Sequence, residues 1–163
     1  MKTLYLLRHA KSGWADISLP DRERPLEARG ERDAVKMGKR WSRQHVKPDL
    51  IVSSPALRAL ATAQVVAQHL EVKTRKITVD ERLYAATETT LIAVIEALDD
   101  KLDRVMLVGH NPGFTELANH FDGTITHMPT CALAEFRFEG ESWAGIGRAR
   151  PARTIFDSPK QAP

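Results

Sequence analysis

Arginine and histidine side chains follow three apolar runs of this sequence, each near the point where the run ends. The three segments are Leu7-Arg8-His9, Ser53-Ser54-Pro55-Ala56-Leu57-Arg58 and Val108-Gly109-His110-Asn111-Pro112-Gly113. Guanidinium groups match phosphoryl oxygens bidentately, and a neutral imidazole nitrogen is a capable nucleophile. If the segments are neighbours, Arg8, His9, Arg58 and His110 form one cluster that suits phosphoryl transfer. The cluster contains no matched set of acidic or cysteine ligands, so we expect neither a metal ion nor another cofactor.

Apolar runs alternate with helix-like stretches along the chain. The strand-like runs are residues 3–7, 50–53, 77–79 and 104–109, and a fifth run, 132–138, alternates in a half-exposed way. The helix-like stretches are residues 27–45, 55–70, 88–98 and 112–121. Strands that alternate with helices indicate βαβ units. The sequence therefore predicts a three-layer α/β/α fold with a mostly parallel central sheet.

Two of the helix-like stretches begin with a capping pattern directly after a strand. Ser54-Pro55 and Asn111-Pro112 each offer a side-chain N-cap followed by proline at the first helical position. The carboxyl ends of parallel strands meet at one edge of a sheet, where ligands of open α/β sheets bind. Two helix N-termini beside Arg8 and His9 would favour an anion at this edge.

The composition is that of one ordinary globular domain. The chain has 163 residues, of which 42% are apolar and 28% are charged. We expect a single domain over residues 1–150 and a polar, proline-containing surface tail over residues 151–163. The N-terminal apolar run is too short for a signal segment or a membrane helix, so we expect a cytoplasmic protein with no membrane partner. We also expect a monomer.

Cysteine usage and charge exclude further classes of protein. The single cysteine, Cys131, rules out an internal disulfide and a multi-cysteine zinc site, and we expect a buried apolar residue rather than a nucleophile. The isoelectric point is about 9.2, but the formal charge is only +3 and basic residues are scattered among acidic ones. Because no aromatic residues are interleaved with the basic ones, we expect no nucleic-acid partner.

The motifs together resemble a known family. The segments LRHA, SSPALRA and VGHNPG are similar to the motifs of the histidine phosphatase superfamily, whose hallmark is Arg-His-Gly at a strand end. The segments LRHAKSGW, DRERPL and Arg29-Gly30 resemble the SixA-type phosphohistidine phosphatase branch in particular. The resemblance extends over about residues 2–138. It implies a phosphoglycerate mutase-like fold in a minimal form without a cap domain.

The resemblance implies a role for each residue of the cluster. His9 becomes the nucleophile that is transiently phosphorylated, while Arg8, Arg58 and a charged His110 bind the phosphoryl oxygens. An unperturbed imidazole pKa of about 6.5 allows His9 to present an unprotonated nitrogen near neutral pH. Water then attacks the phosphohistidine and completes a two-step hydrolysis. The substrate and partner that the SixA-type branch implies is a phosphohistidine-bearing protein, such as a phosphotransfer domain.

Three alanines depart from the family pattern. Ala10 replaces the usual third-position glycine, a change that is common in the SixA-type branch. Ala15 stands where mutase-like relatives carry an asparagine that touches phosphate. Ala85 stands where mutase-like members carry their acidic proton donor, so the usual general acid is missing. Asp21 and Glu88 are possible substitutes, although each residue is also typical of an ordinary loop or helix start.

Two other functions are compatible with the same residues. The first is a phosphatase or mutase that acts on small phosphomonoesters. Members that enclose small metabolites usually add segments over the site, and this chain has little length to spare. The second is a non-catalytic phosphate-binding module, which would not need an unprotonated nucleophile between two arginines.

Several residues near the motifs admit a structural role. Trp14 either flanks the substrate or packs the loop onto the body of the protein. Asp21, Arg24 and Arg29 are expected to form a structural charge network around the loop that follows His9. The remaining histidines match no motif, and we expect no function for them: His45, His69, His120 and His127.

Overall fold

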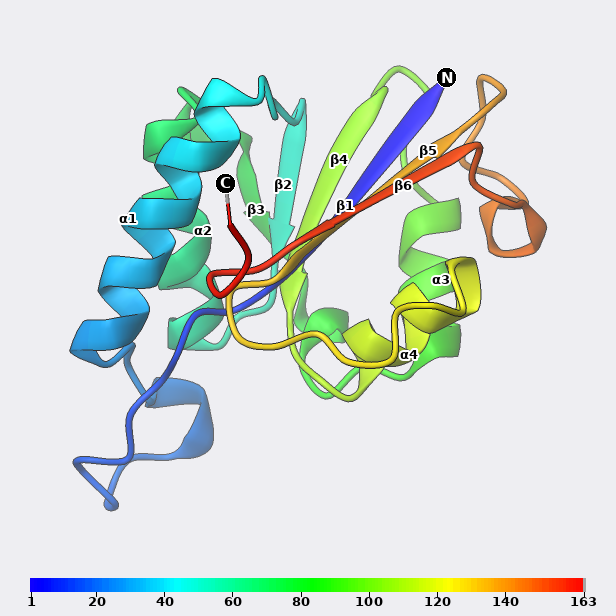
Figure 1. The fold of residues 1–163 in the computed structure, drawn as a ribbon. Coiled ribbons are helices and arrows are strands. Elements are labelled where there is room, and N and C mark those ends of the chain that lie inside the picture. Colours follow the sequence, from blue (N-terminus) through cyan, green and yellow to red (C-terminus); the bar gives the residue numbers. More distant parts are fainter. Residues whose placement is uncertain (163) are drawn as a thin grey trace.

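The apolar run that precedes His9 lies inside a six-stranded sheet (Figure 1). In the computed structural model, which describes residues 1–162, the strands are β1 (Lys2–Arg8), β2 (Leu50–Ser53), β3 (Ile77–Val79), β4 (Arg104–Gly109), β5 (Leu133–Phe138) and β6 (Arg153–Asp157). Their order in the sheet is β3-β2-β4-β1-β5-β6. Strands β3, β2, β4 and β1 are parallel, whereas β5 is antiparallel to β1 and β6 is antiparallel to β5. The prediction of a mostly parallel sheet is confirmed.

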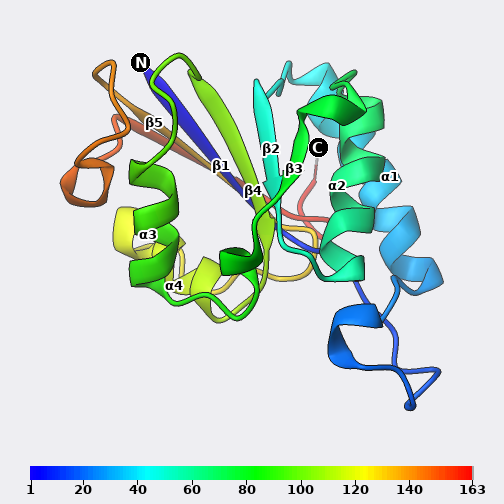
Figure 2. The same cartoon turned by 180° about the vertical axis from the view of Figure 1, so that it is seen from behind.

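Helices cover both faces of the sheet (Figures 1 and 2). They are α1 (Ala28–Arg43) and α2 (Leu57–His69) on one face, and α3 (Glu88–Glu96) and α4 (Gly113–Phe121) on the other. Leu4 and Leu6 of β1 belong to the apolar cluster under α3 and α4, while Tyr5 and Leu7 belong to the cluster under α1 and α2. This alternation confirms the three-layer α/β/α fold. Within residues 1–162, no helix combines the length and the apolar content that a membrane span requires.

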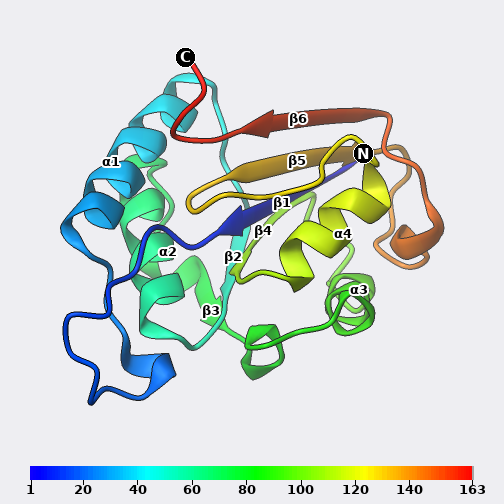
Figure 3. The same cartoon turned by 60° about the horizontal axis from the view of Figure 1, so that its bottom comes forward.

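The register of the parallel strands brings the three polar segments to one edge of the sheet. Arg8 pairs with Gly109, and Ser53 pairs with Val108. The pairing continues one residue further, because the His9 amide donates to the Gly109 carbonyl at 3.0 Å and the Ser54 amide donates to the Val108 carbonyl at 2.9 Å. Figure 3 turns this end of the sheet toward the reader. The loops that carry the candidate residues therefore leave the sheet together.

The two helices behind these loops begin later than predicted. Helix α2 begins at Leu57 rather than at Pro55, because Ala56 is still extended at φ −60° and ψ 135°. Helix α4 begins at Gly113, one residue after Pro112. The predicted capping side chains still accept hydrogen bonds, since Ser54 Oγ accepts from the Ala56 amide at 3.2 Å and Asn111 Oδ1 accepts from the Thr115 amide at 3.2 Å. The prediction was thus correct for the capping side chains of Ser54 and Asn111, and wrong for the first residue of each helix.

The prediction of a surface tail over residues 151–163 is wrong for Arg153–Asp157, which form β6. The free edge of β5 offers backbone hydrogen-bonding groups, and the short segment pairs with them over its whole length. The Asp157 carboxylate then accepts from Arg40 Nη1 at 2.8 Å and from Trp41 Nε1 at 3.0 Å, both on α1. The sheet therefore extends past the expected boundary at residue 150. Pro163, the last residue of the predicted tail, lies outside the described residues.

Candidate active site

The structure brings the four predicted residues together at the edge of the sheet. Arg8 ends β1, His9 follows it, Arg58 lies in the first turn of α2, and His110 follows β4. They line a pocket of about 300 Å³ together with Lys11, Ser12, Trp14, Arg24, Asn111 and Thr130. His9 is only 7% exposed, Arg58 is 5% exposed and His110 is 9% exposed. The protonation of the two buried imidazoles is therefore set by the protein interior rather than by water.

His9 presents its Nε2 atom as an unprotonated nitrogen. The Nδ1 atom lies 2.7 Å from the Ala10 carbonyl oxygen, and a carbonyl oxygen only accepts, so Nδ1 carries the proton. Burial lowers the pKa of His9 from 6.5 to about 3, and the charges of Arg58 and Arg8 act in the same direction. The hydrogen bond to Ala10 opposes this shift without overcoming it. His9 is therefore neutral near pH 7, with the lone pair on Nε2.

Ser54 is the hydrogen-bond partner of His110. The Ala56 amide donates to Ser54 Oγ, and Ser54 Oγ lies 2.7 Å from His110 Nε2. When the hydroxyl donates its own proton to Nε2, the neutral ring carries its hydrogen on Nδ1. Nδ1 is buried and has no partner among the described residues. The ring centroids of His9 and His110 are 5.1 Å apart, so the two imidazoles are neighbours.

The expectation that His110 is charged is wrong for the free protein. Burial lowers the pKa of His110 to about 4, and the positive charge of Arg58 lowers it further, while Asp21 opposes the shift. A neutral imidazole still donates one hydrogen bond, through whichever ring nitrogen carries the hydrogen. In the tautomer with the hydrogen on Nδ1, His110 is a neutral donor.

The buried Arg58 and the half-buried Arg8 line the pocket with the two imidazoles. Arg8 Nη1 donates to the Met128 carbonyl at 3.0 Å, and Arg58 donates to Asp21 through Nη1 at 2.7 Å and Nη2 at 3.0 Å. The Nε atoms of Arg8 and Arg58 are buried and have no partner among the described residues. Burial lowers the pKa of Arg8, and the proximity of Arg58 lowers it further. Two desolvated cations this close repel each other, and an anion bound between them would relieve that repulsion.

Asp21 is not placed to act as a general acid. Its carboxylate accepts from the Tyr84 hydroxyl, from Arg24 Nε at 3.1 Å and from Arg58 Nη2 at 3.0 Å. These bonds, the one from Tyr84 above all, hold the pKa of Asp21 well below its ordinary value, so the carboxyl is ionised. Tyr84 was missed by the sequence analysis, because no local pattern connects it with a residue so distant in the chain. The predicted charge network includes Asp21 and Arg24, whereas Arg29 lies 3.7 Å from Asp33 on its own helix.

Glu88, the second candidate acid, lies at the start of α3 and outside the residues that line the pocket. Its Oε1 atom is 3.1 Å from His120 Nδ1, so this carboxylate is paired with a histidine that the sequence analysis left without a function. Ala85 is exposed and offers no proton. The described residues thus place neither candidate acid where it could protonate a leaving group.

Trp14 fits both of the roles considered for it. The side chain lines the pocket and is 66% exposed, and its ring lies 3.7 Å from Arg24 Cζ. It stacks on a residue of the loop and also borders the entrance. Cys131, by contrast, is fully buried, and burial raises the pKa of its thiol far above the ordinary value. The expectation that Cys131 is a buried apolar residue is confirmed.

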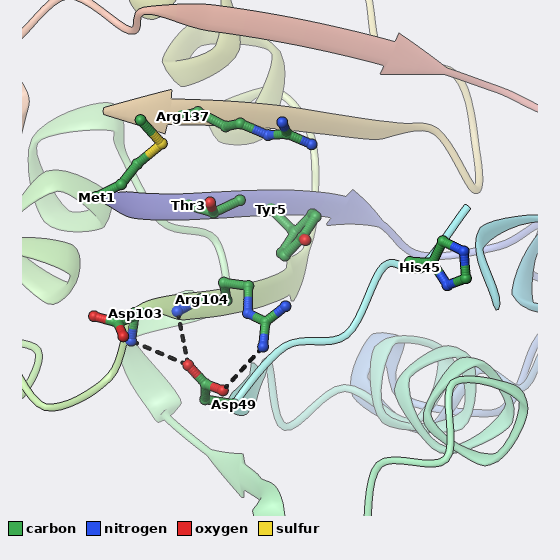
Figure 4. A pocket seen from close by; sticks show the side chains of 8 residues that line it. All are labelled: Met1, Thr3, Tyr5, His45, Asp49, Asp103, Arg104 and Arg137. Carbon is green, nitrogen blue, oxygen red and sulfur yellow. Dashed lines mark hydrogen bonds and ion pairs between the residues drawn. The ribbon is translucent and has the colours of Figure 1, made fainter. Parts of the chain in front are cut away.

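A second hollow, of about 400 Å³, lies at the opposite end of the sheet (Figure 4). It is lined by Met1, Thr3, Tyr5, His45, Asp49, Asp103, Arg104 and Arg137. Its charged groups have partners, since Asp49 accepts from the backbone amides of Asp103 and Arg104 and lies 3.8 Å from Arg104 Nη2, and Arg137 donates to Glu135 at 2.7 Å. Burial raises the pKa of Tyr5 to about 12, so its phenol stays protonated. The unpaired buried donors of the first pocket have no counterpart here, and the pocket at His9 is the candidate active site.

Two sequence relatives match most of the chain. An uncharacterized chloroplastic protein of Arabidopsis thaliana is 34% identical over 152 residues, which cover 87% of this chain and 69% of that protein. An uncharacterized protein of Mycobacterium tuberculosis is 30% identical over 166 residues, which cover 94% of this chain and 100% of that protein. Neither relative is described by an activity.

Solved structures and a family match complete the comparison. A protein of Agrobacterium tumefaciens assigned as a SixA phosphohistidine phosphatase is 27% identical, with a TM-score of 0.80 over 94% of this chain and 97% of that one. The protein histidine phosphatase SixA complexed with tungstate has a TM-score of 0.77 at 22% identity, over 96% of this chain and 97% of that one. Residues 4–90 match the family described as the histidine phosphatase superfamily, branch 1. The chain therefore belongs to the histidine phosphatase superfamily, and its fold is that of the SixA proteins.

Proposed function

We propose that this phosphatase works through transient phosphorylation of His9 Nε2, and that its substrate is phosphohistidine in a protein. One observation carries the proposal. The Ala10 carbonyl fixes the proton of His9 on Nδ1, which leaves the Nε2 lone pair free in a pocket lined by cations, two of which, Arg8 and Arg58, have a buried Nε donor without a partner among the described residues. A nucleophile beside unpaired donors is what a two-step phosphoryl transfer requires. The SixA neighbour that was solved with tungstate, a tetrahedral oxyanion, supports the same use of the pocket.

In the first step, His9 Nε2 attacks the phosphorus of the substrate. A new P–N bond forms to His9, and the P–N bond to the substrate histidine breaks. The leaving imidazole takes a proton from water at its remote nitrogen and departs as a neutral ring. Arg8, Arg58 and His110 Nδ1 donate to the phosphoryl oxygens and stabilise the charge that shifts onto them during in-line transfer.

In the second step, water attacks the phosphohistidine on His9. The P–O bond forms, the P–N bond breaks, and inorganic phosphate carries away one hydrogen of the water while the other returns to solvent. His9 Nε2 regains its lone pair. The proton that the first step removes from solvent is thus restored by the second, and no group of the protein changes its protonation over the cycle.

The substrate class follows from the state of the two candidate acids. Asp21 is held ionised by Tyr84, Arg24 and Arg58, and Glu88 is paired with His120 away from the pocket. Expulsion of a serine or sugar alkoxide requires a proton donor, which is typically worth a hundredfold or more in rate. A phosphorylated imidazole takes its proton from solvent and needs no such donor. Phosphohistidine is therefore the substrate that this pocket is equipped to hydrolyse.

The test compares kcat/KM for three substrates at matched concentration with EDTA present throughout. The substrates are a histidine peptide phosphorylated with phosphoramidate, a phosphoserine peptide and a sugar phosphate. We expect the phosphohistidine peptide to be hydrolysed at least about a hundredfold more efficiently than either alkyl phosphate. A better alkyl phosphate substrate would point to a small-molecule phosphomonoesterase with an unrecognised acid, and turnover that requires added magnesium would overturn the metal-free mechanism.

A trapping experiment tests the nucleophile itself. Turnover of a radiolabelled substrate is stopped by denaturation at alkaline pH, where phosphoramidate bonds survive, and the label should be found on His9. The His9→Ala variant should show neither label nor phosphate release. Binding of phosphate without any turnover by the unsubstituted chain would instead make the protein a phosphate-binding module.

A further inference from the structure

Arg24 lies in the pocket but has so far been assigned only to the loop. It is 7% exposed and belongs to the residues that line the pocket with Arg8, His9, Arg58 and His110. Its positive charge is among those that lower the pKa of His110. Burial of a third guanidinium beside two others costs free energy unless hydrogen bonds or an anion compensate its charge.

The loop holds the Arg24 guanidinium in one orientation. Nε donates to Asp21 at 3.1 Å, while Nη1 donates to Ser12 Oγ at 2.9 Å and to the Gly13 carbonyl at 3.3 Å. The Trp14 ring covers one face of the group at 3.7 Å. A backbone bridge between Ser12 and Leu26 also ties the two sides of the loop together. The planar group is therefore fixed by its own neighbours before any ligand arrives.

One donor of this fixed group stays available. Nη2 makes no hydrogen bond to a described residue. It is also accessible to solvent, unlike the unpaired and buried nitrogens Arg8 Nε, Arg58 Nε and His110 Nδ1. Arg58 differs in that each of its terminal nitrogens already donates one of its two hydrogens to Asp21. Arg24 Nη2 is thus a pre-oriented N–H donor that is accessible to solvent, on a residue that lines the pocket.

We propose that Arg24 is a further substrate-binding residue, whose Nη2 donates to an oxygen of the bound phosphoryl group. The assignment rests on the proposed use of the pocket for a phosphoryl group and adds a third guanidinium to Arg8 and Arg58. Asp21 becomes a positioning residue in this arrangement, since its carboxylate holds Arg24 Nε on one oxygen and Arg58 Nη2 on the other. The loop that follows the nucleophile thereby supplies part of the anion site.

The test measures the affinity of the folded protein for tungstate by calorimetry, so that it does not depend on turnover. Arg24→Met removes the donors and keeps an unbranched side chain of similar length, and Arg24→Lys keeps the charge without the planar fork. Arg29→Ala, which removes an exposed arginine paired with Asp33, is the matched control. Thermal melting of each variant, followed by circular dichroism, reports whether the fold survives.

A charge-assisted hydrogen bond corresponds to roughly a tenfold to hundredfold change in affinity. We expect Arg24→Met to weaken tungstate binding by at least about tenfold, Arg24→Lys to weaken it less, and Arg29→Ala to change it by less than about twofold. Added methylguanidinium should restore part of the affinity of Arg24→Met, which a purely structural role for Arg24 would not allow.

Two outcomes overturn the assignment. One is an unchanged tungstate affinity in a folded Arg24→Met protein, whatever happens to its melting temperature. The other is an unsubstituted chain that binds no tungstate. Failure of the proposed function gives a different result. If the protein binds tungstate through Arg24 but releases no phosphate from any substrate, the assignment of Arg24 stands and the phosphatase mechanism is wrong.

Discussion

The buried imidazole of His9 makes the stability of the protein depend on pH. Its pKa is about 3 in the folded protein, against 6.5 for an unperturbed imidazole. Between these two values the unfolded chain binds a proton at His9 that the folded chain does not bind. Lowering the pH through this window therefore favours unfolding, and the loss of stability begins near pH 6.5 and continues toward pH 3.

The size of this effect follows from the two pKa values. Between pH 7 and pH 5, protonation of an imidazole with a pKa of 6.5 stabilises the unfolded state by about 2 kcal/mol, while the folded state gains almost nothing. This is a large part of a typical unfolding free energy of roughly 5–15 kcal/mol. Replacing His9 by glutamine, which does not titrate, removes the contribution.

The assay is urea unfolding of the unsubstituted protein and of His9→Gln at pH 7, 6 and 5. The difference between their unfolding free energies at pH 7 sets the baseline, and contributions from other groups, His110 included, are present in both proteins. We expect this difference to move by about 2 kcal/mol in favour of His9→Gln on going to pH 5. Parallel pH profiles for the two proteins would show that His9 titrates normally when folded, and the assignment of a neutral nucleophile by burial would then fail.

Four other substitutions test the site and the fold. Arg58→Ala and His110→Ala should each lower kcat by about a hundredfold or more with a smaller change in KM, because their contacts strengthen in the transition state, and steady-state kinetics would show it. Asp21→Asn should lower the rates of hydrolysis of p-nitrophenyl phosphate and phenyl phosphate by similar factors, because Asp21 positions Arg58. A much larger loss for phenyl phosphate would show that Asp21 is a general acid. Asp157→Ala should lower the unfolding free energy by about 3 kcal/mol in urea titration, because it leaves the Arg40 guanidinium buried without its carboxylate, and a loss below 1 kcal/mol would contradict this.

The features that could be predicted from the sequence are those that depend on local patterns of residue type. The run LYLL shows by its continuous apolar character that β1 is buried on both faces, and the polar residues after it mark the carboxyl end of the strand. The same reasoning applied to β2 and β4 was enough to bring His9, Arg58 and His110 to one edge. The three-layer arrangement with a mostly parallel sheet followed from the alternation of strands and helices, whereas the order of the strands was not predicted.

The features that were missed depend on contacts between distant segments. Tyr84 reaches Asp21 across 63 positions of sequence, and no local spacing indicates that bond. The charge of His110 was wrong because burial, which a motif does not report, lowers its pKa. Strand β6 was missed because RTIFD is a weak strand signal between two prolines, and its pairing depends on the edge that β5 offers.

The distance in sequence between β5 and β6 has a consequence for how the protein is made. Strand β5, with the sequence LAEFRF, is followed by 14 residues before its partner Arg153–Asp157 begins. Until residues 153–157 leave the ribosome, β5 is an apolar edge strand whose backbone groups can pair with any other chain. Strand β6 therefore acts as a cover against aggregation. A chain that stops at residue 150 is expected to associate with copies of itself through β5 even where its pocket can still form.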